Sequence, residues 1–110
     1  MDRETRKALK ESIAHWYRIS ACETVEDLLR EGYYSDKCAL CQMFFLGIGA
    51  DVCDGGCPVK QITGQSNCAG SPYSVAYDSL RMWIHTGKWY NTDQDNIEAE
   101  IRFLESLLEE

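Results

Sequence analysis

Five cysteines lie within 31 residues in the middle of this chain, and they constrain its fold more than any other feature. Cys38 and Cys41 are separated by two residues, Cys53 and Cys57 by three, and Cys68 follows eleven residues later. Packing alone seldom requires such clustering. The ordinary explanations are a bound metal, disulfide bonds or redox chemistry.

A structural zinc site is the interpretation that this pattern favours. Tetrahedral zinc takes four thiolates, and a C-x-x-C pair lets two of them converge from one tight turn. The chain can therefore build a four-thiolate site within about residues 35–73, with one of the five thiols left over. Such a closed site leaves no coordination position for water, so it would order the segment rather than catalyse. An iron–sulfur cluster and disulfides or free thiols are the alternatives; Pro58 after Cys57 fits a ferredoxin-type motif, but the spacing does not.

The composition predicts one folded domain over residues 1–110. Hydrophobic residues make up 45% of the chain, with three Trp and six Tyr, which argues against disorder. No apolar run approaches the roughly 20 residues of a membrane span, and none follows the charged N-terminus, so we expect neither membrane insertion nor a signal peptide. We therefore expect a cytoplasmic protein, in a compartment where clustered cysteines more often hold metal than form disulfides.

The net charge of −7 is concentrated near the end of the chain. Residues 1–90 carry 11 acidic and 10 basic side chains, whereas residues 91–110 carry seven acidic side chains and Arg102 alone. Because there is no basic patch, direct nucleic-acid binding is not expected. We interpret the acidic stretch as a solvated helix face. The alternative is a surface that docks a basic partner or mimics a phosphate backbone.

Apolar residues recur at helical spacing over most of the chain, so we predict a mostly α-helical fold of three to four helices. Residues 47–71 contain six glycines and are expected to form a long loop that the metal ties down. Residues 40–48 are apolar and fit either a short helix or a strand. The expected helices run over about residues 2–20, from the Thr24 cap to Gly32, from Ser71 and Pro72 to Gly87, and from about Asp95 onward.

The last helix carries an apolar seam at Ile97, Ile101, Leu104 and Leu108, a spacing typical of coiled coils. We expect this seam to pack on the first helix of the same chain. A homodimer through residues 95–108 is the alternative. The expected core comprises Trp16, Leu80, Trp83, Ile97, Ile101 and Leu104.

Three further residues could serve as ligands or catalytic groups. Cys22 precedes the cluster by sixteen residues and is expected to be a small buried apolar residue. His15 is expected at the edge of the core, with an additional metal ligand as the alternative, and His85 near a helix C-terminus. No local pattern pairs either histidine with a nucleophile, and there is no phosphate-binding loop, so we predict no catalytic residue.

Several short motifs follow one another between residues 7 and 85: Ser12-Ile-Ala-His15-Trp16, Cys38-Ala-Leu-Cys41, Cys53 and Cys57 with Pro58-Val59, Thr63-Gly64, and Cys68-Ala-Gly-Ser71-Pro72-Tyr73. Together they resemble a family of small bacteriophage-encoded proteins of unassigned function. That family has two residues between its third and fourth cysteines where this chain has three, which bears on whether Cys53 and Cys57 bind as an ordinary pair. The resemblance implies a phage accessory protein made in an infected bacterial cytoplasm, and it implies no reaction.

The sequence therefore favours a small zinc-binding protein that acts without catalysis by binding a host protein, for example one in defence or nucleic-acid metabolism. Small size, a closed metal site, the lack of a catalytic motif and the acidic end of the chain support this hypothesis. The alternatives are an iron–sulfur or thiol redox protein, and a nucleotide-binding sponge or acidic nucleic-acid mimic.

Overall fold

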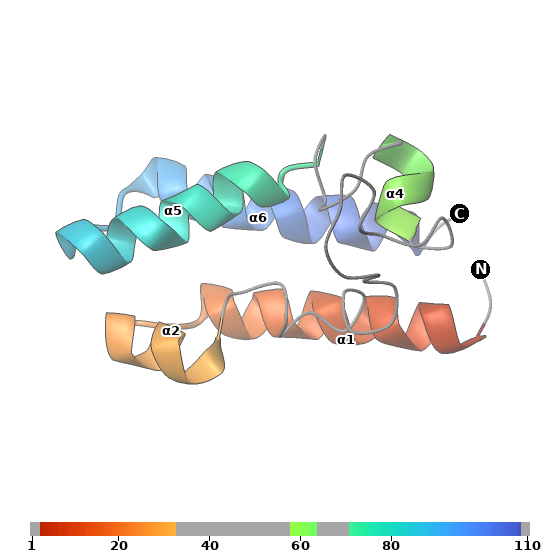
Figure 1. Ribbon diagram of the computed structural model, residues 1–110, viewed down its shortest axis with the longest axis horizontal. Coiled ribbons are helices and arrows are strands. Elements are labelled where there is room, and N and C mark those ends of the chain that lie inside the picture. Colours follow the sequence, from red (N-terminus) through yellow and green to blue (C-terminus); the bar gives the residue numbers. More distant parts are fainter. Residues whose placement is uncertain (1–2, 33–57, 64–70, 109–110) are drawn as a thin grey trace, which may run out of the picture.

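All regular structure in the described part of the chain is helical (Figure 1). The computed structural model describes residues 3–32, 58–63 and 71–108. The mostly α-helical fold is thus confirmed, while the apolar residues 40–48 lie outside the described part. The helices are α1 (Arg3–Ser20), α2 (Val25–Glu31), α4 (Pro58–Thr63), α5 (Tyr73–Thr86) and α6 (Asn91–Leu107).

The last helix, α6, packs against α1, α5 and α4. In Figure 1, α5 and α6 lie in one layer and α1 with α2 in a second, so the core fills the space between the layers. All six expected core residues are at most 9% exposed, and Ile97 is fully buried. The same core contains Leu9 of α1 and Leu28 of α2, each 0% exposed. The amphipathic spacing in the sequence therefore identified the buried faces.

The apolar seam of α6 packs within the chain, as expected. Ile97, Ile101 and Leu104 are buried, and α1 is one of the helices that cover them. Arg6 of α1 also donates a hydrogen bond to the carbonyl oxygen of Leu108 at 3.2 Å, which joins the first turns of α1 to the end of α6. A homodimer through residues 95–108 stays a prediction, and it would have to use another face of α6 or an exchange of helices.

Caps define both ends of α2 and the C-terminal end of α5 where the sequence placed them. At the start of α5 the N-cap is Pro72 rather than the expected Ser71, and Pro72 makes no side-chain capping hydrogen bond. The Thr24 hydroxyl accepts a hydrogen bond from the Asp27 amide at 3.1 Å, at the first turn of α2. Gly32 follows α2 with φ 81° and Gly87 follows α5 with φ 72°. Residues with a Cβ atom rarely adopt such positive φ values, so glycine suits both helix ends.

Two further differences from the expectation concern α6 and α4. α6 begins at Asn91 rather than near Asp95, because the Asp93 carboxylate accepts a hydrogen bond from the Tyr90 amide at 2.9 Å and satisfies the helix start. α4 occupies six residues of the region expected to be loop, so the described part contains five helices rather than three or four. Pro58 suits the first position of α4 because its missing amide hydrogen would have no partner there.

The acidic stretch is not a uniformly solvated helix face. Asp95, Glu98 and Glu105 are exposed, as expected, but Glu100 is only 1% exposed. Glu100 lies between seam residues Ile97 and Ile101 in the sequence, on the side of α6 that faces the rest of the molecule. The expectation was therefore wrong for this one carboxylate.

The start of α6 can be tested by substituting Asp93. Asp93→Ala should lower the free energy of unfolding by about 1 kcal/mol, because it removes the acceptor for the Tyr90 amide and an acidic side chain from the first turn. Urea denaturation measures the change. Asp95→Ala is the control and should stay within about 0.5 kcal/mol. Equal losses for the two variants would contradict a helix start at Asn91.

Candidate functional site

The structure neither brings the clustered cysteines together nor separates them, because all five lie outside the described residues. Which four of them bind metal therefore stays a prediction. Within the described ranges, no group of three or more His, Cys, Asp or Glu side chains is placed to hold a metal ion. The predicted ligands are Cys38, Cys41, Cys53, Cys57 and Cys68.

Two stretches of the chain carry the clustered cysteines: the first is residues 33–57 and the second is residues 64–70. The helical core holds Gly32, the residue directly before the first stretch. Gly32 is the last described residue before Cys38, and its carbonyl oxygen lies 2.7 Å from Nε2 of His15. A carbonyl oxygen can only accept a hydrogen bond, so Nε2 carries the hydrogen. Because His15 is 6% exposed and belongs to α1, this bond ties Gly32 to a rigid helix.

Helix α4 fixes the point at which the first stretch ends and the second begins. Cys57 directly precedes Pro58, the first residue of α4. Val59 is 2% exposed and belongs to the hydrophobic core, and α4 packs on α6. The hydroxyl of Thr63, the last residue of α4, donates to the Val59 carbonyl at 2.9 Å. A helix of six residues is thus held by the core rather than by its own length.

The end of the second stretch is held at the start of α5. The Ser71 hydroxyl accepts a hydrogen bond from the Tyr73 amide at 3.2 Å. The Tyr73 ring makes an edge-to-face contact with Trp16, with centroids 6.0 Å apart, and stacks on Tyr77 at 5.9 Å. Aromatic pairs of this kind contribute about 0.5–1.5 kcal/mol beyond the burial of their area. Cys68 lies only three residues before this anchored start.

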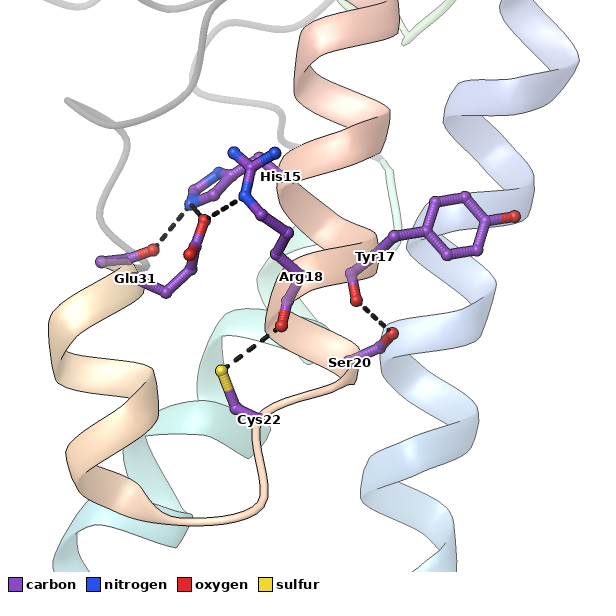
Figure 2. A network of polar contacts seen from close by, with 7 residues as sticks. His15, Tyr17, Arg18, Ser20, Cys22 and Glu31 are labelled. Atoms are coloured by element: carbon purple, nitrogen blue, oxygen red, sulfur yellow. Dashed lines mark hydrogen bonds and ion pairs between the residues drawn. The ribbon is translucent and has the colours of Figure 1, made fainter.

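A polar network surrounds the anchor at Gly32 (Figure 2). Glu31 receives a hydrogen bond from Arg18 Nε at 2.7 Å, and the same carboxylate oxygen lies 3.7 Å from Nε2 of His15. The expected place of His15 at the core edge is confirmed by its burial. Since Nε2 donates to Gly32, this nitrogen is not available as the additional metal ligand considered from the sequence.

Cys22 follows α1 and is half-buried, less than expected. Its Sγ donates to the Arg18 carbonyl at 3.3 Å, as Figure 2 shows. Burial raises the pKa of the Cys22 thiol, and the carboxylates of Asp27 and Glu31 raise that pKa further, while Arg30 lowers it. Because the thiolate is the form that binds metals, these surroundings support leaving Cys22 outside the ligand set.

The hollow beside Cys22 is lined mainly by charged side chains that pair with one another. It measures about 400 Å³ and lies between α1 and α2. Both guanidinium groups in its lining are paired, Arg18 with Glu31 and Arg30 with Asp27. Cys22 donates to a backbone carbonyl rather than to a histidine, and His85 lies exposed in the last turn of α5, as expected. The described residues therefore show no Cys–His nucleophile pair.

A second hollow, of about 220 Å³, lies between α1 and α6 and was missed by the sequence analysis. Tyr17 of α1 and Glu105 of α6 both line it, and the Tyr17 hydroxyl donates to the Glu105 carboxylate at 3.1 Å. This hydrogen bond raises the pKa of the Tyr17 hydroxyl. The two residues are 88 positions apart, so no local motif joins them. The only signal in the sequence was the surplus of acidic residues after position 90.

None of the protein-family models, curated proteins and solved structures compared with this chain matches it. The resemblance to small phage proteins therefore stays an expectation, and function has to be argued from the residues themselves. In the described part of the chain, no helix combines the length and apolar character needed to span a membrane.

The raised pKa of Cys22 predicts slow alkylation. The midpoint of its rate–pH profile with iodoacetamide should lie above the ordinary pKa of a thiol, because burial and nearby carboxylates favour the protonated form. Peptide mapping by mass spectrometry separates Cys22 from the other cysteines. A folded-state pKa raised in this way stabilises the fold below the ordinary thiol pKa, and that contribution is lost as the pH rises through the raised value.

Asp27→Asn should move the Cys22 midpoint towards lower pH, because it removes one of the carboxylates that raise the thiol pKa. Glu4→Gln, in the first turn of α1, is the matched control and should leave the midpoint unchanged. A wild-type midpoint at or below the ordinary value would contradict the described surroundings of Cys22.

Proposed function

We propose that this chain is a small zinc-binding accessory protein of bacteriophage type, which acts without catalysis by binding a host protein in the bacterial cytoplasm. The observation that carries the zinc proposal is the anchoring of Gly32, α4 and Tyr73 on one helical core. Held ends reduce the chain entropy lost when separate stretches close around one ion. The donor set is thiolate, which zinc binds in structural sites.

The energetic weight of such a site would be large for a chain of 110 residues. A structural zinc contributes on the order of 10 kcal/mol to folding, which is comparable with the roughly 5–15 kcal/mol by which a whole domain is stable. Zinc would therefore decide the order of the cysteine-bearing stretches, and the helices would supply the frame. Such an arrangement suits a binding protein, because a metal held by the cysteine-bearing stretches leaves the helix surfaces free for a partner.

The partner half of the proposal is supported by the acidic exposed face of α6 and by the motif resemblance to phage proteins. Asp95, Glu98 and Glu105 are exposed on the same helix, whose only basic residue is Arg102. A surface of one charge sign speeds association with a partner of the opposite sign.

Elemental analysis tests the zinc half. Protein purified without added metal or chelator should contain one zinc per chain and absorb no visible light. Cys38→Ser or Cys41→Ser should lose the zinc and lower the melting temperature, because each removes one of two thiolates in the C-x-x-C pair. Cys22→Ser is the control and should keep both the zinc and the stability.

Two results would contradict the zinc assignment. Iron with absorbance near roughly 400 nm would identify an iron–sulfur cluster instead and make redox assays the first priority. Release of zinc by Cys22→Ser alone would show that the ligand set is wrong.

Affinity capture from bacterial lysate tests the partner half. Wild-type protein should recover a specific partner, and Asp95→Asn/Glu98→Gln/Glu105→Gln should lose it, because the acidic face is neutralised. The control neutralises three acidic side chains on α1 and α2 (Glu4, Glu11 and Glu26) and should recover the partner as well as wild type does. Recovery of no specific partner, or equal loss in both variants, would count against the proposal.

A further inference from the structure

The hollow between α1 and α6 has an aromatic wall and an acidic rim. Tyr17 and Ser20 line it from α1, and Ile101 of α6, which is 4% exposed, also lines it. On α6, four lining residues at positions 94, 98, 101 and 105 follow one another turn by turn and form a stripe about 16 Å long, and Arg102 lies beside this stripe. We call this hollow the α1–α6 groove.

Tyr17 supplies the aromatic wall. Its side chain is 49% exposed, although most large apolar side chains of α1 are buried. In Figure 2 it points towards α6 and away from the pair formed by His15 and Glu31. The hydrogen bond from its hydroxyl to Glu105 keeps the ring and a carboxylate side by side. A cation placed here would meet a π face and a negative charge together.

The charges along the rim favour a positively charged occupant. Glu98 and Glu105 are two helical turns apart on one face of α6, about 10 Å along the axis, and both are exposed. Arg102 lines the groove between them and offsets one of the two charges. The net charge of the rim is therefore −1. It lies within residues 91–110, which carry seven acidic side chains and one basic side chain.

We propose that the α1–α6 groove binds an arginine or lysine side chain from a basic peptide segment of the protein partner. The inference rests on the proposed function, because it names the chemistry of the partner that the function requires. The aliphatic stem would lie against Ile101 and the Tyr17 ring, with the cationic head between Glu98 and Glu105. Arginine fits better than lysine, because a planar guanidinium can stack on tyrosine and pair with a carboxylate through two hydrogen bonds.

The test uses acetyl-hexa-arginine amide as the probe and the full chain labelled with ¹⁵N, at low ionic strength. The largest amide shifts should occur around Tyr17, Ser20, Glu98 and Glu105. Glu98→Gln/Glu105→Gln should weaken the apparent affinity about five- to tenfold, because two exposed ion pairs are lost. Glu4→Gln/Glu26→Gln changes the net charge equally but lies outside the groove, and should weaken it less than twofold.

Two further variants separate a built groove from general attraction to an acidic protein. Arg102→Gln should strengthen binding two- to threefold, because it removes the one positive charge in the rim. Tyr17→Ala should weaken binding about threefold, whereas Tyr17→Phe keeps the π face and loses only the hydrogen bond to Glu105, so it should weaken binding less than Tyr17→Ala does. The dispersion of the amide spectrum reports whether each variant is folded.

Several results would contradict the proposal that the groove binds a basic side chain. Amide shifts spread evenly over the acidic residues, or equal effects of the two double neutralisations, would show general charge attraction. Spermidine binding as tightly as the peptide, or a dimer of the chain whose interface covers Tyr17 and Glu105, would also contradict it. Zinc is measured in the same samples. A chain that holds one zinc but shows no shifts in the groove overturns the groove alone. A chain that binds the peptide there without any zinc overturns the zinc proposal alone.

Discussion

The whole described structure depends on the burial of α6 against three other helices. Ile97, Ile101 and Leu104 are at most 4% exposed, and each such side chain contributes roughly 1.5–3 kcal/mol when it leaves water. The same helix carries most of the excess negative charge of the chain. Repulsion between neighbouring like charges on a helix costs only about 0.2–0.5 kcal/mol per pair, so burial wins and the helix forms despite its charge. Asp95, Glu98 and Glu105 are then left exposed, where the proposed partner could reach them, whereas Glu100 is buried.

The same packing holds the ends of the two cysteine-bearing stretches. The first stretch starts at Gly32, which His15 holds, and ends at Pro58, and the second ends beside Tyr73. All of these points rest on α1, α5 or α6. A metal bound between the two stretches would therefore close loops whose ends are already fixed, and little of its binding free energy would be spent on bringing the ends together.

Helix positions were largely predictable from the sequence, because apolar spacing and end residues act locally. Thr24, Gly32 and Gly87 marked their helix ends correctly, since each acts on residues within one turn. The start of α6 was missed because Tyr90 is not a usual cap residue; the signal lay in Asp93, which reaches back to the Tyr90 amide. α4 was missed because six residues are too few to show a helical period, and only its burial on α6 makes it a helix.

The two candidate sites differ in the same way: one is predicted from residues close together in the sequence, and the other forms only when distant residues pack together. Metal ligands can be predicted from spacing, because thiolates a few residues apart can converge on one ion. The cysteine prediction rests on the sequence alone, and no described residue tests it. The α1–α6 groove could not be inferred in that way, since Tyr17 and Glu105 meet only after two helices pack. A pattern of charge can show that the end of the chain is acidic. Only the packing of α6 decides that Glu98 and Glu105 line a hollow while Glu100 is buried. The packing therefore determines which of the acidic side chains form an accessible surface.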